Sequence, residues 1–171
     1  MTAEEITQYL TELNDELRQM DIKGEVSLFG GAVMVLAFNS RIATKDVAAV
    51  FQPTAEIRSA VKLIAQRHGL LETWLNDGVK GYVVQHSRNV LFHLPNLTVF
   101  IPVPDYLLAM KALAARVGTE DEEDVLTLVE SLRLKTSDEV FTIIEKYYPK
   151  RQIPPKTQYF IEGLLEINDH G

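Results

Sequence analysis

The sequence predicts an α+β fold, in which a small sheet with helices is followed by a helical bundle. Two patterns predict it: short strand-like stretches and amphipathic helical stretches alternate up to residue 103, and strand patterns disappear after Pro104. The composition agrees, because a chain of 171 residues, 46% of them hydrophobic, can form a core without disulfides. We therefore divide the chain into an α/β portion, residues 1–103, and a helical portion, residues 104–171.

The α/β portion begins with an amphipathic helix. Thr2 and Glu5 have the spacing of a capping box, and apolar residues then recur at helical intervals, which predicts a helix over residues 3–20. Pro95 and Asn96 predict a hairpin between two strands. The other elements that we expect in this portion are strands at 25–29, 47–51, 82–85, 90–94 and 97–101 and helices at 31–38 and 55–68, the second of them capped by Thr54.

The helical portion contains three or four helices. Residues 105–117 form the first of them in this prediction, because the segment is apolar and has no strand pattern. Thr119 with Glu122, and Thr136 with Glu139, have the spacing of capping boxes, which predicts that two further helices begin there. Prolines between residues 149 and 155 separate the last two helices.

Charge and composition exclude several classes of protein. The net charge of −7 disfavours nonspecific binding to DNA, which needs a basic face. The chain has no cysteine, so disulfides, thiolate metal sites and thiol catalysis are excluded. Its longest apolar run is far below the roughly 20 residues of a membrane span, so we expect no membrane association. The N-terminus has acidic residues and no basic cluster, unlike a secretory signal, which predicts a cytoplasmic protein of a bacterium or archaeon.

The sharpest local feature is a strand pattern that ends in Gly30 and Gly31 before a helix. Two glycines at such a turn let backbone N–H groups come close to a phosphate. The alternative is a tight turn without a ligand. Arg41, Thr44 and Asp46 follow just before a buried strand, and this order of residues favours the first interpretation.

The order of Gly30, Gly31, Arg41, Thr44 and Asp46 resembles the nucleotidyltransferase fold related to DNA polymerase beta. The resemblance is closest to the branch that includes abortive-infection toxin nucleotidyltransferases and related uncharacterised bacterial proteins. The helical portion extends it, since that branch has a helix with a lysine and an arginine followed by an acidic segment. The matching positions here are Lys111, Arg116 and Asp124, and the segment from Trp74 to Asp77 is also similar to a motif of these relatives.

The resemblance implies a small mixed sheet flanked by helices, with a C-terminal helical bundle that forms the other wall of a cleft. It also implies transfer of a nucleotidyl group from a nucleoside triphosphate to a hydroxyl acceptor on an RNA, a protein or a small molecule. The roles that it implies are phosphate binding by Gly30 and Gly31, magnesium binding by Asp46, contacts to the triphosphate by Arg41, Thr44 and Lys111, and accessory roles for Asp77, Arg116 and Asp124.

Two departures from the family pattern lead to a second interpretation. The second carboxylate of the family should stand two residues after Asp46, where this chain has Ala48, and no Asp or Glu lies between Asp77 and Asp105. Nucleotidyl transfer in that family uses magnesium ions bridged by several carboxylates. The chain is therefore either a transferase with a degenerate metal site or a catalytically inactive binding or regulatory module, with a protein partner in a toxin–antitoxin or phage-defence pair.

Each charged candidate also has a structural interpretation. Asp46 could cap a turn or pair with Arg41 or a neighbouring lysine. Lys111 could lie on the surface with its head in water. Arg116, Asp121 and Asp124 could form an ion-pair network between consecutive helices. A purely structural or oligomerisation domain is a third interpretation of the whole chain.

Overall fold

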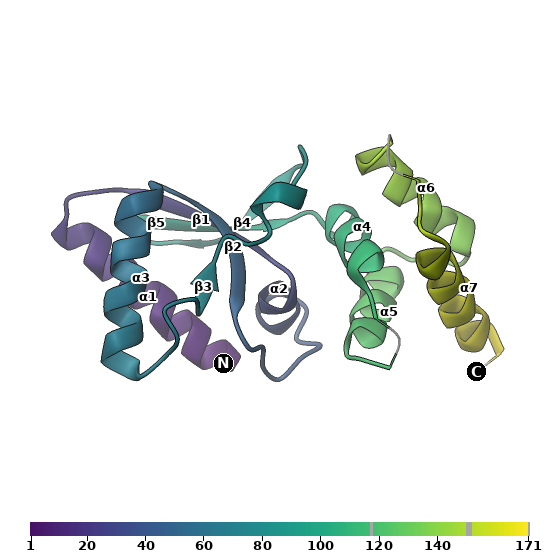
Figure 1. Cartoon of the computed structure of the whole chain (residues 1–171), viewed down its shortest axis with the longest axis horizontal. Coiled ribbons are helices and arrows are strands. Elements are labelled where there is room, and N and C mark those ends of the chain that lie inside the picture. The colour runs from purple at the N-terminus through teal and green to yellow at the C-terminus, as the bar shows by residue number, and fades with distance from the viewer. Residues whose placement is uncertain (117, 150–151, 171) are drawn as a thin grey trace. The chain divides into compact units, whose positions relative to one another are not determined.

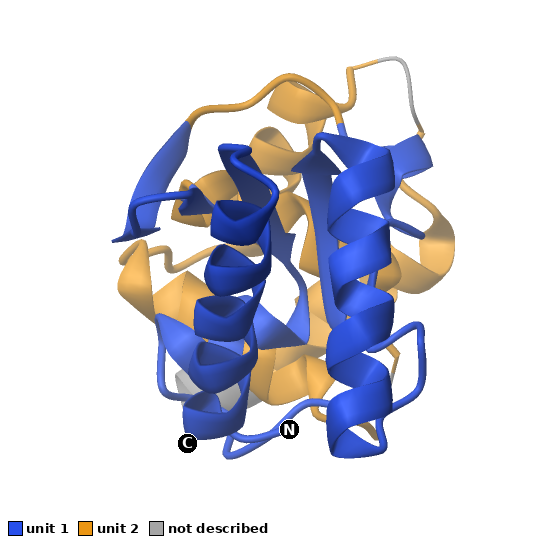
Figure 2. Cartoon of the chain, turned by 90° about the vertical axis from the view of Figure 1, so that its left-hand side faces the viewer, with its two compact units in different colours: residues 1–83, 88–102 blue, residues 84–87, 103–171 orange. Residues whose placement is uncertain are grey.

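The computed structural model describes residues 1–116, 118–149 and 152–170, which form two compact units. Unit 1 comprises residues 1–83 and 88–102, and unit 2 comprises residues 84–87 and 103–171 (Figure 2). The elements of unit 1 are α1 (Ala3–Gln19), β1 (Gly24–Phe29), α2 (Gly31–Leu36), β2 (Val47–Gln52), α3 (Thr54–His68), β3 (Leu75–Asn76), the 3-10 helix η1 (Lys80–Tyr82), β4 (Arg88–His93) and β5 (Leu97–Pro102) (Figure 1). Those of unit 2 are α4 (Pro104–Ala114), α5 (Asp121–Ser131), α6 (Ser137–Tyr147) and α7 (Pro155–His170).

Unit 1 is built on a mixed sheet of five strands in the order β3-β2-β1-β5-β4. The central strand β1 runs antiparallel to β2 and parallel to β5, β2 runs parallel to β3, and β4 runs antiparallel to β5. The α+β class and the mixed sheet with helices are therefore confirmed. The hairpin around Pro95 and Asn96 is confirmed as well, because the Leu94 N–H donates to the Leu97 carbonyl at 2.8 Å.

One face of this sheet forms the core of unit 1 together with α1 and α3, which lie side by side (Figure 2). Successive strand residues point to opposite faces, so alternate positions such as Val26, Leu28 and Val99 are fully buried there. The helices come very close to β1, since a Cβ on Gly24 would lie 2.9 Å from Leu17 Cδ1 and 3.2 Å from Ile57 Cδ1. Both helices therefore reach the sheet through their apolar stripes.

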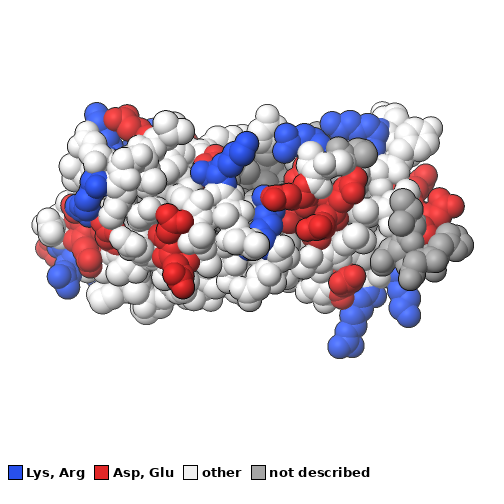
Figure 3. Space-filling model, turned by 90° about the horizontal axis from the view of Figure 1, so that it is seen from below, with Lys and Arg blue, Asp and Glu red and all other residues white. Residues whose placement is uncertain are grey.

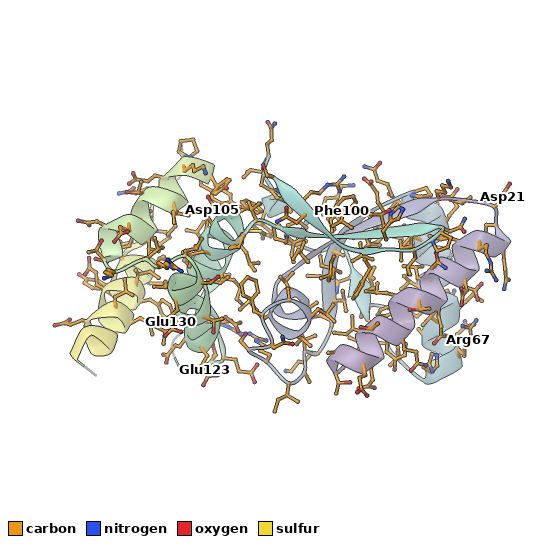
Figure 4. The ribbon with its side chains drawn as sticks, turned by 180° about the vertical axis from the view of Figure 1, so that it is seen from behind. Asp21, Arg67, Phe100, Asp105, Glu123 and Glu130 are labelled. Atoms are coloured by element: carbon orange, nitrogen blue, oxygen red, sulfur yellow. The ribbon has the colours of Figure 1, made fainter. Side chains whose placement is uncertain are left out.

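The other face of the sheet carries the intervening strand residues, most of which are only partly buried, although Phe29 is 1% exposed. Ser27, Val50 and Phe100 lie opposite one another in register on β1, β2 and β5. Phe100, labelled in Figure 4, has the Arg88 guanidinium 3.6 Å from its ring centre, and Arg88 Nη1 donates to Ser27 Oγ at 2.8 Å. This second face also contains Ala48, which pairs with Phe29.

Residues 82–85 do not form the predicted strand. The segment begins in η1, and residues 84–87 belong to unit 2 because their polar groups find partners there. The Val84 N–H donates to the Tyr106 hydroxyl at 3.0 Å, the His86 ring stacks on the Tyr106 ring with centroids 4.0 Å apart, and the Ser87 carbonyl accepts from the Val103 N–H. Conversely, β3 was not predicted, because a strand of two residues has no periodicity to recognise.

Two of the predicted helix caps are confirmed and two are wrong. The capping boxes of α1 (Thr2 with Glu5) and α6 (Thr136 with Glu139) are both complete. Thr54, by contrast, is the first residue of α3 and donates its hydroxyl to the Phe51 carbonyl, so Pro53 occupies the N-cap. Thr119 does not cap α5 either: the helix begins two residues later at Asp121, whose N–H donates to Thr119 Oγ1.

No helix in the described ranges of the chain is long and apolar enough to cross a membrane.

Candidate functional site

The turn between β1 and α2 has a backbone that only glycine adopts easily. Gly30 is the N-cap of α2 and has φ 63° and ψ −141°, a region that residues with a Cβ avoid for steric reasons. Gly31 is the first residue of the helix. The double glycine therefore lies at a sharp strand-to-helix turn, as the sequence pattern predicts.

Gly31 is restricted by its surroundings, because a Cβ at this position would have no room. A Cβ on Gly31 would lie 2.7 Å from Thr44 Oγ1, 3.1 Å from Arg41 Nη1 and 3.3 Å from Thr44 Cβ. No other described glycine would bring its Cβ so close to a side-chain hydroxyl and a guanidinium. The structure thus brings three of the predicted phosphate-binding residues together around the turn.

The loop that carries Arg41 and Thr44 is anchored at its end by the first residues of the chain. The Thr44 N–H donates to the Met1 carbonyl at 2.9 Å, the Met1 amino group donates to the Thr44 carbonyl at 2.6 Å, and Thr2 forms an isolated bridge with Ala43. The Thr44 hydroxyl donates to the Asp46 carbonyl at 3.1 Å. These bonds hold the Thr44 side chain against Gly31.

Asp46 is exposed and its carboxylate is held by an amide from a neighbouring strand. Asn76 Nδ2, on β3, donates to Asp46 Oδ2 at 3.0 Å and to the Thr73 carbonyl at 3.1 Å, while Asn76 Oδ1 accepts from the Gly78 N–H. Asn76 was not among the predicted site residues. The available signal was the segment from Trp74 to Asp77, within which it lies.

The carboxylates of unit 1 do not fit a site for two magnesium ions. Ala48 pairs with Phe29 of β1 on one side and with Asn76 of β3 on the other, so neither of the two described strand positions beside Ala48 carries a carboxylate. Asp77, the predicted accessory acid, has its Oδ2 2.6 Å from Arg58 Nη2. Within the ranges that the structure describes, no group of three or more His, Cys, Asp or Glu side chains could hold a metal ion.

A pocket of about 280 Å³ opens beside Asp46. Its wall combines Lys45 and Asp46 with the apolar side chains of Leu70, Leu71 and Trp74. The indole of Trp74 is buried, donates to the Val61 carbonyl at 3.0 Å and meets the Tyr9 ring edge to face. Trp74 therefore has a packing role that also shapes this pocket.

In unit 2, Lys111 takes part in a buried ion cluster between α4 and α5. Lys111 Nζ lies 2.8 Å from Asp124 Oδ2 and 3.3 Å from Asp121 Oδ1. The Lys111 side chain is 12% exposed, and that of Asp124 only 1%. Asp121 and Asp124 point inward one helical turn apart, while Glu120 and Glu123 are exposed. Acidic side chains accordingly gather over this part of the chain in Figure 3, and Glu123 is labelled in Figure 4.

Arg116 joins this cluster through Asp121. Its backbone N–H and its Nε donate to Asp121 Oδ2 at 3.1 and 3.3 Å. Burial alone would raise the pKa of the Asp121 carboxyl, but a side-chain hydrogen bond with Thr119, the charge of Lys111 and the bonds from Arg116 hold that pKa below its usual value. The structure therefore contains the ion-pair network between consecutive helices, with Lys111 at its centre.

Apart from Asp77, which pairs with Arg58, the predicted site residues form two groups. Gly30, Gly31, Arg41, Thr44 and Asp46 surround or follow the glycine turn of unit 1, whereas Lys111, Arg116 and Asp124 form one ion cluster of unit 2. No protein-family model, curated protein or solved structure matches this chain.

Proposed function

We propose that this chain is a nucleotidyltransferase-like protein that binds a nucleoside triphosphate and acts as a binding or regulatory module without transferring the nucleotidyl group. The observation that carries the proposal is the close approach of Thr44 and Arg41 to Gly31. The turn would supply backbone N–H groups, Thr44 a hydroxyl and Arg41 a guanidinium, which are the groups that bind phosphate oxygens. These groups belong to the turn between β1 and α2 and to the loop between α2 and β2, where the resemblance to nucleotidyltransferases predicts the phosphates.

The carboxylates argue against the transfer reaction. Two-metal catalysis needs several carboxylates that bridge the ions, and the described strand positions on both sides of Ala48, Phe29 and Asn76, carry none. Asp46 itself accepts a hydrogen bond from Asn76. In this proposal Asp46 and Asn76 border the site and help to fix the end of the phosphate-binding loop.

Lys111 has the weakest support among the residues that would contact the triphosphate. A phosphate would have to compete for its ammonium with two carboxylates at 2.8 and 3.3 Å, one of them almost fully buried. Separating such a pair leaves a buried charge without its partner, which is costly. The proposal therefore assigns the phosphate contacts to Arg41 and Thr44.

The test is calorimetric titration of the protein with ATP, CTP, GTP and UTP, each with and without magnesium. We expect one or more nucleotides to bind, and Arg41→Gln to weaken that binding about tenfold or more, because a charge-assisted hydrogen bond is lost. Gly31→Asp should weaken it too, since its side chain would occupy the space of the Thr44 hydroxyl. Arg18→Gln, on an exposed arginine at the end of α1, is the matched control. No binding of any nucleotide, or equal affinity in the wild type and in Arg41→Gln, would refute the proposal.

A second candidate function is nucleotidyl transfer with a reduced metal site, and the position of Ala48 makes it testable. Ala48 Cβ lies 4.0 Å from where a Cβ of Gly30 would stand, so Ala48→Asp would place a carboxylate beside the turn. Nucleotide binding that requires magnesium and is lost in Asp46→Ala would favour this candidate. Magnesium-dependent transfer that appears only in Ala48→Asp would instead indicate a binding site that lacks the catalytic carboxylate.

A further inference from the structure

A second concave site lies within unit 2 and shares no residue with the glycine turn. It is a pocket of about 500 Å³ lined by Ala115, Arg116, Lys156, Tyr159 and Phe160. Its volume is in the range of sites for small molecules, which are mostly apolar and have a few polar groups that orient the ligand. The five residues come from the link between α4 and α5 and from the first two turns of α7.

Arg116 presents a positioned guanidinium at one side of this pocket. Its backbone N–H and its Nε are both held by Asp121, which is fixed in turn by Lys111. The Arg116 side chain is nevertheless 73% exposed. Among the described residues, Asp121 is the only hydrogen-bond acceptor that this guanidinium has, and it binds Nε, so the two terminal nitrogens can serve a ligand.

Helix α7 supplies a second cation and an aromatic ring from the same helical face. Lys156 and Tyr159 are three residues apart, which places them one above the other on the helix surface. Tyr159 is 75% exposed, one of the few large apolar side chains in the described chain with such exposure. Phe160 and Ala115 are buried and form the apolar floor.

We propose that this pocket binds a small molecule with a planar aromatic ring that carries a phosphate or carboxylate group. Arg116 and Lys156 would hold the anionic group, since both are exposed cations in a chain whose net charge is −7. Tyr159 would stack on the ring, which would lie over Phe160 and Ala115. This site is independent of the proposed nucleotide site, because all five residues belong to unit 2.

The test uses phenyl phosphate as the probe. Inorganic phosphate and phenol, which correspond to its anionic and aromatic parts, are the comparison ligands. We expect phenyl phosphate to bind saturably and each comparison ligand to bind about tenfold more weakly or worse, because each lacks one of the two kinds of contact. In amide NMR spectra, phenyl phosphate should shift the signals of residues 115–116 and 156–160 and leave those of residues 30–31 unchanged. Benzoate in place of phenyl phosphate distinguishes a carboxylate site from a phosphate site.

Three variants and one control decide the outcome. Arg116→Gln and Lys156→Gln should each weaken phenyl phosphate binding about tenfold, and Tyr159→Ala should remove the advantage of phenyl phosphate over inorganic phosphate. Lys135→Gln removes an exposed charge elsewhere in unit 2 and should leave the affinity unchanged. Binding that is equal in the wild type and in Arg116→Gln and Lys156→Gln, or the absence of saturable binding, would overturn the proposal. Inorganic phosphate that binds as tightly as phenyl phosphate would overturn the role of Tyr159.

Discussion

At the scale of single residues, Gly30 and Gly31 are required for different reasons. Gly30→Ala would place a Cβ in ordinary van der Waals contact with Ala48 Cβ, at 4.0 Å, but would force the residue into a backbone conformation that is almost exclusive to glycine. We expect this change to lower the free energy of unfolding by about 1–3 kcal/mol, measured by urea denaturation. Gly81→Ala is the matched control, because Gly81 has no positive φ and nothing within 4 Å. Equal stability of the two variants would contradict the steric argument.

The buried ion cluster makes a second prediction at the residue scale. Lys111→Met would leave Asp124 without its ammonium partner and should lower the free energy of unfolding by about 3–5 kcal/mol. Lys111→Met combined with Asp124→Leu removes both charges and should recover most of that loss. Urea denaturation of the wild type, both single variants and the double variant gives the coupling energy. A loss below about 1 kcal/mol in Lys111→Met would mean that the pair is solvated.

At the scale of elements, charged side chains in the last turn of α3 bind glutamates of α1. Glu12 of α1 accepts from Arg67, which is labelled in Figure 4, and from His68, both on α3; Arg67 also pairs with Glu16. Burial alone would raise the pKa of the Glu12 carboxyl, but its bonds with His68, Arg67 and Gln8 lower that pKa below its usual value. A carboxyl whose pKa is lowered by folding stabilises the protein above its unfolded pKa of about 4.3.

This linkage predicts how the contact between α1 and α3 depends on pH. The stabilisation by Glu12 should be complete above about pH 5 and be lost as the pH falls through the lowered folded pKa. The stability difference between the wild type and Glu12→Gln should therefore be largest near pH 7 and shrink towards pH 3. Urea denaturation at several pH values measures it, with Glu4→Gln, an exposed glutamate of the same helix, as the control. A difference that stays constant with pH would contradict the assignment.

The two threonines that precede α5 and α6 make another prediction at the element scale. Thr136 forms a complete capping box, so Thr136→Ala should lower the free energy of unfolding by about 1 kcal/mol. Thr119 lies outside the N-cap of α5, and its hydroxyl accepts from the Asp121 N–H and donates to the Arg116 carbonyl. Thr119→Ala should therefore act mainly by removing the hydrogen bond to the Arg116 carbonyl, which connects residue 116 to the start of α5. Amide NMR shifts centred on residues 116–121 would support this, whereas shifts along the whole of α5 would contradict it.

At the scale of the whole molecule, the two proposed sites belong to different units. A nucleotide present at about 100 times its Kd should stabilise unit 1 by about 2.7 kcal/mol, and phenyl phosphate should do the same for unit 2. Hydrogen exchange can separate the two effects. We expect the nucleotide to protect amides around residues 28–47 and phenyl phosphate to protect those around residues 115–116 and 155–160. Protection of one common segment by both ligands would show that the two sites are not distinct.

Local chemistry explains which parts of this chain could be predicted without coordinates. The capping box of α1, the hairpin at Pro95 and the glycine turn all depend on residues that are near one another in the sequence. The strand predicted at 82–85 failed because the Tyr82 and Val83 N–H groups bond locally to Val79 and Lys80, whereas the Val84 N–H bonds to Tyr106 of α4, 22 positions later. The role of Asn76 was missed because its amide meets Asp46 only after β2 and β3 have paired.

The sequence by itself therefore determined the α+β class, the order of most helices and strands, and the residue types available for binding or catalysis. Only the tertiary structure decided how those residues are used: Gly31 lies against Thr44 and Arg41, and Lys111 is paired with Asp121 and Asp124. Periodicity, capping and turn preference act over a few residues, and they can be read along the chain. Ion pairs and close packing depend on the register of strands and the packing of helices, which are set only when distant segments meet.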